Sequence, residues 1–227
     1  ILLRGDICRG CTTHIQIDTY KSIIKHVIGP LRKNCNDINI IIVTYKDADT
    51  GFIKELFGKF NCFFFEIRRS TQVNGFVASL NIILEHNLLE QCEGIIVLRS
   101  DLYFIQDLDY TRKKNDNILF QWNLLHQKST GEMADQIHFI GGDLVYEFIN
   151  KVNKFQIDTK WSGTLHNLYN FCKIHFGKEN ISYMNYIEDP IHNKDICDIR
   201  GNPMVRLGNP LYNYTRYVDS ILRRNKE

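Results

Sequence analysis

The feature that most constrains the fold is the run Ile38–Tyr45, whose sequence INIIIVTY is apolar and rich in β-branched residues. A strand with one face in water alternates polar and apolar residues, so this run predicts a strand buried on both faces. Shorter apolar runs of the same kind occupy residues 1–3, 62–67 and 94–98. Together they predict four strands of a mainly parallel sheet that helices cover on both sides.

Helical patterns separate these four strands. Asp18–Ile28 places apolar residues at helical spacing, with Asp18 as its cap and Gly29-Pro30 as its stop. Residues 47–60 predict a loop and a short helix, and Gln72–Leu89 predicts a long amphipathic helix. Strands that alternate with helices in this order indicate an α/β domain.

The pattern changes after Asp101. Strands are predicted at 117–122, 136–140 and 181–186, and helices at 143–155 and 161–176, the first capped by Asp143. The polar stretch Glu188–Pro210 predicts a long loop, which in a compact domain is often functional. No linker divides the sequence, so we expect a single domain.

Composition excludes several classes of protein. With 28 Lys and Arg against 26 Asp and Glu among 227 residues, the formal net charge is 28 − 26 = +2, which argues against a nucleic-acid-binding protein that works through bulk charge. The seven cysteines are an odd number, and we interpret most of them as buried thiols of a reducing compartment. No run of apolar residues is long enough for a membrane span. These features predict a cytoplasmic, soluble domain.

The first candidate site follows the fourth strand, where Arg99-Ser100-Asp101 leaves the apolar run. Ligands of open α/β sheets bind beyond the carboxyl ends of the strands. Asp101 could bind a divalent metal that neutralises a diphosphate, and Arg99 could pair with a phosphate or orient Asp101. An Arg–Asp pair that closes the strand without chemistry explains the same residues.

Two further candidates flank other strands. Gly5 follows the first strand and permits close approach of a ligand, while Arg4 and Arg9 could bracket a phosphate. Asp135 and Gln136 precede the strand at 136–140, where a carboxylate could act as a general base or bind a sugar hydroxyl. The alternatives are a solvated loop for the first group and a cap or turn aspartate for the second.

The remaining motifs give weaker evidence for a functional site. His192 in the polar tail could add a ligand to a metal diphosphate, although a solvated acidic loop also explains that segment. Cys8 and Cys11 form a CxxC, but a poor helix start follows it and no second CxxC completes a zinc site. The sequence lacks the glycine-rich motifs that bind the phosphates of ATP and of dinucleotides, G-x-x-x-x-G-K-[ST] and G-x-G-x-x-G.

In this order, the stretches ILLRGDICR, INIIIVTYKD, RRSTQVNGFVASLNIIL, IIVLRSDLYF and ADQIHFIGGD resemble nucleotide-sugar glycosyltransferases of the GT-A type. The likeness is to small viral enzymes, such as those of chlorella viruses, and to capsular-polysaccharide enzymes. It implies a Rossmann-like GT-A fold with a nucleotide-sugar half at 1–104 and an acceptor half with a closing tail at 105–227. It also implies transfer of a hexosyl or deoxyhexosyl group from a UDP- or GDP-sugar to a glycan or protein-linked acceptor, in the host cytoplasm if the protein is viral.

The resemblance also assigns roles to residues. Arg99-Ser100-Asp101 stands where the family has a metal-binding Asp-x-Asp, with arginine in place of the first aspartate. The implied Mn²⁺ or Mg²⁺ ligands are Asp101 and His192, and Asp135 is the implied base for an inverting transfer, with Gln136 beside the acceptor. The residues implied to bind the nucleotide sugar are Arg4, Gly5, Arg9, Gln72, Asn74, Arg99, Ser100 and Asp101. Two other functions stay open: a noncatalytic sugar-nucleotide-binding or glycan-binding domain, and a thiol-redox protein that uses Cys8 and Cys11.

Overall fold

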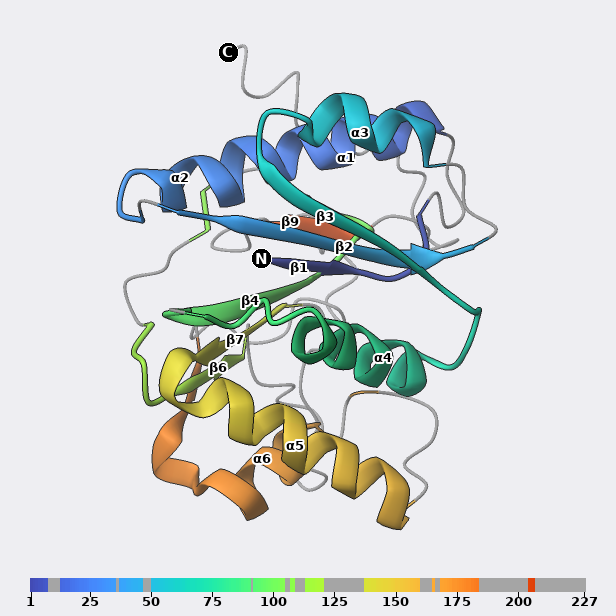
Figure 1. Cartoon of the computed structure of the whole chain (residues 1–227). Coiled ribbons are helices and arrows are strands. Elements are labelled where there is room, and N and C mark those ends of the chain that lie inside the picture. The colour runs from blue at the N-terminus through green and yellow to red at the C-terminus, as the bar shows by residue number, and fades with distance from the viewer. Residues whose placement is uncertain are drawn as a thin grey trace, which may run out of the picture.

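The computed structural model describes residues 1–7, 13–35, 37–46, 50–90, 92–104, 107–108, 113–120, 137–159, 165, 168–183 and 204–206. Its centre is a seven-stranded sheet of order β3-β2-β1-β4-β7-β6-β8 (Figure 1). The strands are β1 (Leu2–Arg4), β2 (Asn39–Tyr45), β3 (Asn61–Ile67), β4 (Gly94–Arg99), β6 (Ile118–Phe120), β7 (Ile137–Gly141) and β8 (Ile181–Tyr183). Only β7 runs against its two neighbours, so the sheet is mainly parallel, as the sequence predicts.

Helices cover both faces of this sheet. One face carries α1 (Thr13–Ile23), η1 (Ile24–Ile28), α2 (Gly29–Arg32) and α3 (Gly51–Phe57). The other carries α4 (Gln72–Glu85), α5 (Gly142–Thr159) and α6 (Leu168–Phe176), and the short helix η4 (Lys178–Asn180) leads into β8. The predicted α/β fold with helices on both sides is therefore confirmed.

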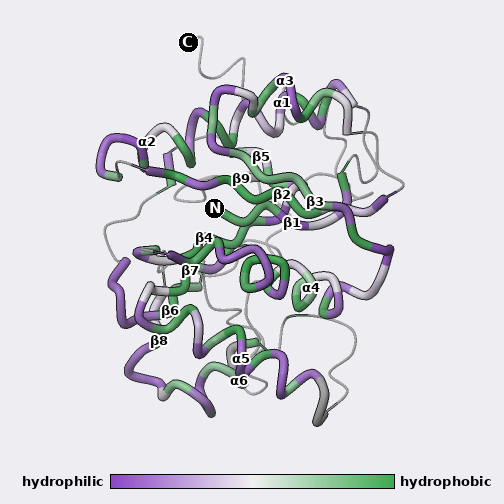
Figure 2. Tube along the Cα trace, viewed as in Figure 1, coloured by the Kyte–Doolittle hydropathy of each residue, from purple (hydrophilic) through white to green (hydrophobic). Residues whose placement is uncertain are grey.

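The central strands separate two cores, and successive residues of one strand enter opposite ones. In β2, Ile40 and Ile42 pack toward α1 and α3, whereas Ile41 and Val43 pack toward α4. All four are at most 4% exposed, which is why this segment has no polar alternation. Figure 2 shows the same arrangement, with hydrophobic strands between helices whose outer turns are hydrophilic.

The first helix differs from its prediction at both ends. It begins at Thr13 rather than Asp18, because Gln16 and Thr19 face the interior and interrupt the apolar pattern. Gly29-Pro30 does not stop it. Instead, the chain widens into the π-helical η1, and Gly29 N–H donates to Ile24 O. Pro30 lies in the first turn of α2 and has no N–H to donate, and the carbonyl of His26, four residues earlier, accepts from Leu108 N–H.

Two other helix ends were predicted wrongly. α4 ends at Glu85 rather than Leu89, because Asn87 adopts φ +53° and Leu88 N–H donates to Ile83 O, as in a Schellman motif. Asp143 is not the cap of α5 but lies inside its first turn. Backbone carbonyls cap this helix, since Gly142 N–H donates to Glu93 O and Asp143 N–H to Asn115 O.

The polar tail, predicted as a loop, contributes a strand. β9 (Met204–Arg206) pairs antiparallel with β5 (Leu102–Phe104), the strand that follows Asp101. Three residues are too few for a recognisable period, so the sequence does not signal this strand. The pairing brings the tail to the segment that carries the first candidate site.

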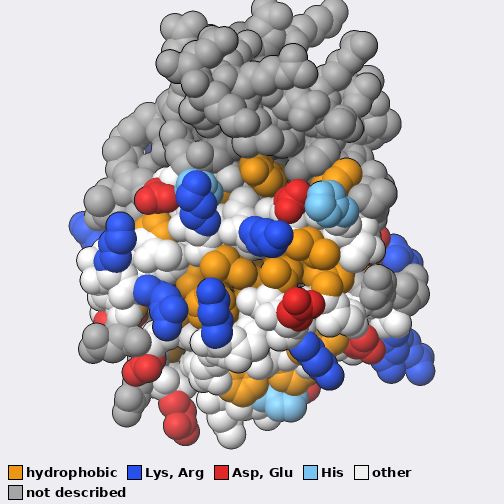
Figure 3. Space-filling view, turned by 90° about the horizontal axis from the view of Figure 1, so that it is seen from above, with side chains coloured by type: hydrophobic (Ala, Val, Ile, Leu, Met, Phe, Trp, Pro, Cys, Tyr) orange, Lys and Arg blue, Asp and Glu red, His pale blue; other side chains and the backbone are white. Residues whose placement is uncertain are grey.

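Charges of both signs lie on the face that α1, α2 and α3 cover (Figure 3). Exposed basic residues of this region are Lys21, Lys25, Arg32, Lys33, Lys54 and Lys59; of the acidic residues, Glu55 is exposed and Asp18 is half-buried. Basic and acidic side chains are therefore mixed on the described part of this face, in line with the small net charge. No helix in the described part of the chain is long and apolar enough to cross a membrane.

Candidate functional site

The strand order changes direction between β1 and β4. From β1 the chain steps outward to β2 and β3 with α1 and α3 on one face, and α4 then crosses the other face to place β4 on the far side of β1. Ligands of open α/β sheets generally bind at such a topological switch point, in a crevice beyond the carboxyl ends of the strands. Arg4-Gly5-Asp6 leaves β1 at this point and Arg99-Ser100-Asp101 leaves β4.

A buried ion pair lies at the end of β4. Arg99 Nε donates to Asp101 Oδ1 at 2.8 Å, and a terminal nitrogen of the same guanidinium donates to Oδ2 at 2.6 Å. The two side chains are only 9% and 5% exposed. Both carboxylate oxygens are therefore bonded in one fork, so Arg99 orients Asp101, one of the two roles predicted for it.

The two strand ends are joined through Ser100. Its N–H donates to Arg4 O at 2.9 Å, and its hydroxyl donates to Asp6 O at 3.3 Å. On its other side, the buried Gln16 of α1 donates from Nε2 to Ser100 O at 2.8 Å. Gly5 adopts φ +117°, and a Cβ at this position would lie 3.4 Å from Ser100 Oγ, so the turn favours glycine. These bonds hold the two turns in one rigid unit.

Two arginines stand side by side across the switch point. Arg4 and Arg99 are register partners on parallel strands, which places both side chains on the face covered by α4. Arg4 is 5% exposed, and its guanidinium carbon lies 5.1 Å from the centre of the Phe76 ring. The sequence analysis placed both arginines at this edge, and the structure confirms that placement.

A second cluster at the same edge escaped the sequence analysis. Arg69, just after β3, donates to both carboxylate oxygens of Asp6 at 2.8 and 3.3 Å and lies 4.8 Å from the ring centre of Tyr45. Asp6 and Arg69 are 63 positions apart, so only the topology brings them together. A signal was available, because the polar residues at 68–70 leave a predicted strand as Arg99 does.

Gln72 and Asn74 lie in the first turn of α4, which starts at this edge. Thr71 caps the helix by accepting from Asn74 N–H at 3.2 Å. The Asn74 side chain faces α5, since its Oδ1 accepts from Gln156 Nε2 at 2.9 Å. That bond favours a role for Asn74 in joining the two helices; its predicted contact with the donor sugar stays a prediction.

The other predicted site residues, Arg9, Asp135, Gln136 and His192, lie outside the described residues, as do Cys8 and Cys11. One observation bears on the acceptor side. Ile137, the first described residue after Asp135 and Gln136, pairs with Leu98, the residue before Arg99. The strand that follows the two predicted acceptor residues therefore begins beside the end of β4.

The described residues at this edge do not fit a divalent cation. Each oxygen of Asp101 already accepts a hydrogen bond from Arg99, so a Mn²⁺ or Mg²⁺ ion at this carboxylate would share it with a guanidinium charge. In the part of the chain that the structure describes, no three His, Cys, Asp or Glu side chains gather in a way that could hold a metal. The Arg99 fork therefore counts against a cation at Asp101, and the metal site implied by the resemblance, whose second ligand His192 lies outside the described residues, stays a prediction.

Two of the four described thiols are poorly suited to nucleophilic chemistry. Cys35, Cys62, Cys92 and Cys172 are free thiols. Burial raises the pKa of Cys62 to about 11 and raises the pKa of Cys172 as well. A nucleophilic cysteine needs a lowered pKa, which neither has. Cys172 matches the predicted buried thiols, whereas Cys62 is only half-buried.

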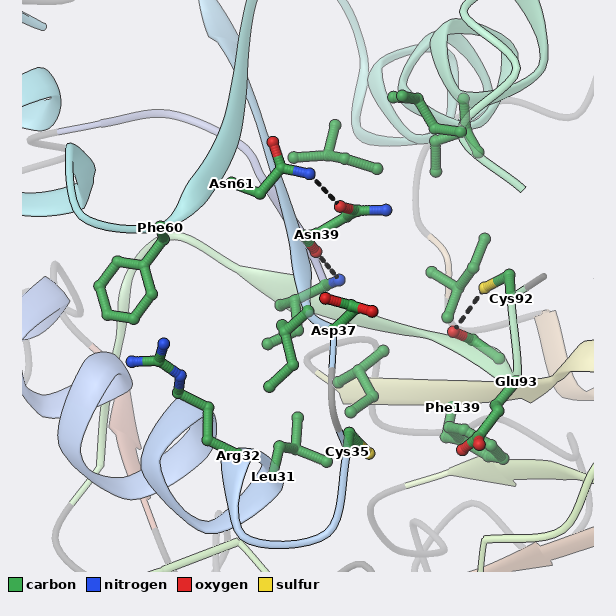
Figure 4. A pocket seen from close by; sticks show the side chains of 18 of the residues that line it. Leu31, Arg32, Cys35, Asp37, Asn39, Phe60, Asn61, Cys92, Glu93 and Phe139 are labelled. Atoms are coloured by element: carbon green, nitrogen blue, oxygen red, sulfur yellow. Dashed lines mark hydrogen bonds between the residues drawn. The ribbon is translucent and has the colours of Figure 1, made fainter. Parts of the chain in front are cut away.

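A pocket of about 650 Å³ lies at the opposite, amino edge of the sheet (Figure 4). Its wall includes the hydrogen-bonded amides of Asn39 and Asn61, together with Arg32 and Asp37. None of the residues predicted to bind the nucleotide sugar lines it. Its volume suits a small ligand, but it lies at the wrong end of the strands for the switch-point crevice. We therefore assign the candidate site to the carboxyl edge.

Comparison with known proteins adds evidence on the fold. No protein-family model matches the chain, and no curated protein matches its sequence. Among solved structures, the CTP:phosphocholine cytidylyltransferase LicC of Streptococcus pneumoniae matches with a TM-score of 0.50 at 12% identity, over 97% of each chain. The glycosyltransferase GlyE of S. pneumoniae TIGR4 matches with a TM-score of 0.50 at 12% identity, over 98% of this chain and 62% of GlyE.

The chain has the GT-A, Rossmann-like fold that its sequence predicts. A glycosyltransferase involved in the glycosylation of the major capsid of PBCV-1 also matches, with a TM-score of 0.49 at 10% identity, over 81% of this chain and 98% of that one. At such identities a likeness establishes the fold and not the activity, because one fold hosts many activities.

Proposed function

We propose that this protein is a glycosyltransferase that moves a sugar from a nucleoside-diphosphate donor to a glycan or protein-linked acceptor. The observation that carries the proposal is the pair of buried arginines, Arg4 and Arg99, at the topological switch point of a GT-A-like sheet. Two guanidinium groups at this position suit a diphosphate, because each can donate two parallel hydrogen bonds to phosphate oxygens.

The reaction forms a bond from the acceptor oxygen to the anomeric carbon and breaks the bond from that carbon to the diphosphate. Negative charge develops on the departing nucleoside diphosphate, and buried donors that are already oriented stabilise such charge strongly. Arg4 and Arg99 are the donors proposed for this role. The acceptor proton passes to the Asp135 carboxylate if the transfer inverts configuration, with Gln136 orienting the acceptor.

Other parts of the sequence-based prediction belong to the same proposal. Gly5 and Ser100 line the nucleotide pocket together with Arg9, while Gln72 contacts the donor. Residues 1–104 form the donor half and residues 105–227 the acceptor half, an arrangement supported by the pairing of Ile137 with Leu98 between the two halves. Metal assistance through Asp101 and His192 stays a prediction, and the Arg99–Asp101 pair argues against it.

A second candidate is nucleotidyl transfer, which the match to LicC over 97% of both chains favours. The two reactions release different products: glycosyl transfer from a sugar nucleotide releases a nucleoside diphosphate, and nucleotidyl transfer from CTP releases pyrophosphate. A noncatalytic binding domain releases neither.

The products therefore test the proposal. The purified chain is incubated in parallel with UDP-sugars, with GDP-sugars, and with CTP plus phosphocholine, and products are separated by ion-exchange chromatography. No glycan acceptor is present, so water accepts the sugar, and we expect a nucleoside diphosphate and free sugar from one sugar nucleotide, at a rate that falls by about 10²-fold in Arg4→Met. Arg32→Met, at the amino edge, is the matched control and should retain the rate. Pyrophosphate from CTP would favour the second candidate, and binding of a sugar nucleotide without turnover would favour the noncatalytic domain.

A further inference from the structure

The departure from Asp-x-Asp at the end of β4 has a structural counterpart in the Arg99–Asp101 pair. We propose that this protein binds the diphosphate of its donor without a divalent cation, and that the Arg99 guanidinium, held in place by Asp101, occupies the role of the metal. This inference rests on the proposed function, since it concerns how the same site neutralises the donor.

The first argument is the bonding of Asp101. Its two oxygens accept from Arg99 at 2.8 and 2.6 Å, in the fork geometry that makes arginine–carboxylate pairs strong. A cation that binds this carboxylate has to displace the guanidinium or lie beside it. Both arrangements are unfavourable. Displacement leaves the guanidinium charge buried without its carboxylate, and a cation beside it places two positive charges together in a desolvated site.

The second argument is that the pair does not rest on side-chain packing alone. Ser100, between the two residues, is tied on both sides of the turn: its N–H bonds to Arg4 O, and its carbonyl accepts from the buried Gln16 side chain. β4 and β1 fix Arg99 from the strand side, and β5 begins directly after Asp101. Bonds that involve no ligand thus fix the backbone positions of Arg99 and Asp101 on either side of Ser100.

The third argument concerns what replaces the charge of a cation. A guanidinium has five N–H groups in a rigid plane, so one arginine has the capacity to hold a carboxylate and a phosphate oxygen together. Arg4 stands beside Arg99 in the strand register and adds a second guanidinium on the same face. Asp101 acts as a positioning residue here: it fixes the plane of Arg99 and does not touch the ligand.

The test measures binding of UDP and GDP to the full chain by isothermal titration calorimetry, first in excess EDTA and then in excess Mn²⁺. We expect the better nucleotide to bind in EDTA with an affinity within about threefold of that in Mn²⁺. An affinity that falls by about tenfold or more in EDTA and returns with Mn²⁺ would overturn the inference and leave the proposed function standing. No binding in either buffer would overturn both.

A variant that restores the acidic motif makes the test sharper. Arg99→Asp should lose nucleotide affinity in EDTA by about tenfold or more and recover part of it in Mn²⁺, because two carboxylates then face the diphosphate. Arg32→Asp makes the same charge change at the amino edge and should bind as the unchanged chain does in both buffers. Equal loss for Arg99→Asp with and without Mn²⁺ supports the arginine role as well, whereas unchanged affinity in EDTA would refute it. Circular dichroism checks that each variant is folded, and the EDTA comparison on the unchanged chain decides the question if Arg99→Asp does not fold.

Discussion

The candidate site contains two arginine–aspartate pairs that differ mainly in burial, and this allows a quantitative prediction. Arg99–Asp101 has side chains that are 9% and 5% exposed, whereas those of Arg69–Asp6 are 55% and 19% exposed. Each guanidinium bonds both oxygens of its aspartate. The change we consider is arginine to methionine in each pair, which removes the charge and keeps much of the side-chain volume.

The burial of each pair determines how much its arginine variant should lower the free energy of unfolding. In Arg99→Met the Asp101 carboxylate stays buried without the two bonds, and breaking a buried pair in this way costs about 3–5 kcal/mol. Arg69→Met leaves a carboxylate that water reaches more easily, and exposed pairs contribute about 0–1 kcal/mol. For a chain of this length, the first change should lower the midpoint of thermal unfolding by about 6–20 °C and the second by about 4 °C or less.

The assay is urea unfolding at neutral pH, followed by circular dichroism and repeated on a double variant. Arg99→Met with Asp101→Leu removes both charges, and we expect it to recover most of the lost stability, since apolar residues often replace a buried ion pair without loss. Two results would refute the reasoning. One is a loss below about 1 kcal/mol for Arg99→Met, and the other is a double variant as unstable as the single one.

Three further predictions concern the fold. Burial raises the pKa of Cys172, so its thiol should react with a thiol reagent only at the rate of unfolding, and a rapid reaction in native buffer would contradict its placement. Burial, followed by the charge of Lys151, lowers the pKa of His175, so the folded state binds a proton at this ring less readily than the unfolded chain does. The free energy of unfolding should therefore decrease as pH falls below 6.5. Urea unfolding at successive pH values should show a smaller decrease in His175→Asn. Gly94 has φ +156°, and a Cβ there would lie 2.7 Å from the Phe139 ring, so Gly94→Ala should cost about 2–4 kcal/mol in the same assay.

The sequence predicts those elements of the fold in which nearly all buried residues are apolar. Ile38–Tyr45 was predicted as a two-sided strand because β-branched residues enter both cores, and the strand is found at Asn39–Tyr45. The start of α1 was missed because Gln16 and Thr19 are buried polar residues, and an apolar period does not register them. The buried amide of Gln16 bonds to Ser100, 84 positions along the chain, which a local pattern does not contain. Thr19 instead bonds to Ile15 within the helix, which satisfies its hydroxyl in the interior.

The same distinction applies to the candidate site. Arg4, Arg99 and Asp101 were predicted because they end apolar strands, and the carboxyl edge of a parallel sheet is where ligands bind. The second cluster, Asp6, Tyr45 and Arg69, was not predicted, because the association of these residues depends on which strands are neighbours. Strand order is a property of the assembled sheet, and it brings Arg69 to Asp6 across 63 positions.

The net charge of +2 conceals how the positive charge at this edge is arranged. Arg99 is held by Asp101, Arg69 by Asp6 and Tyr45, and Arg4 lies over Phe76. An arginine side chain loses up to about 2 kcal/mol of conformational entropy when it is fixed, and here folding rather than ligand binding bears that cost. The aspartates weaken the long-range attraction for an anion but leave the guanidinium planes ordered before it arrives. Under the proposed function, we expect such an edge to select a ligand by the geometry of its phosphate oxygens more than by its total charge.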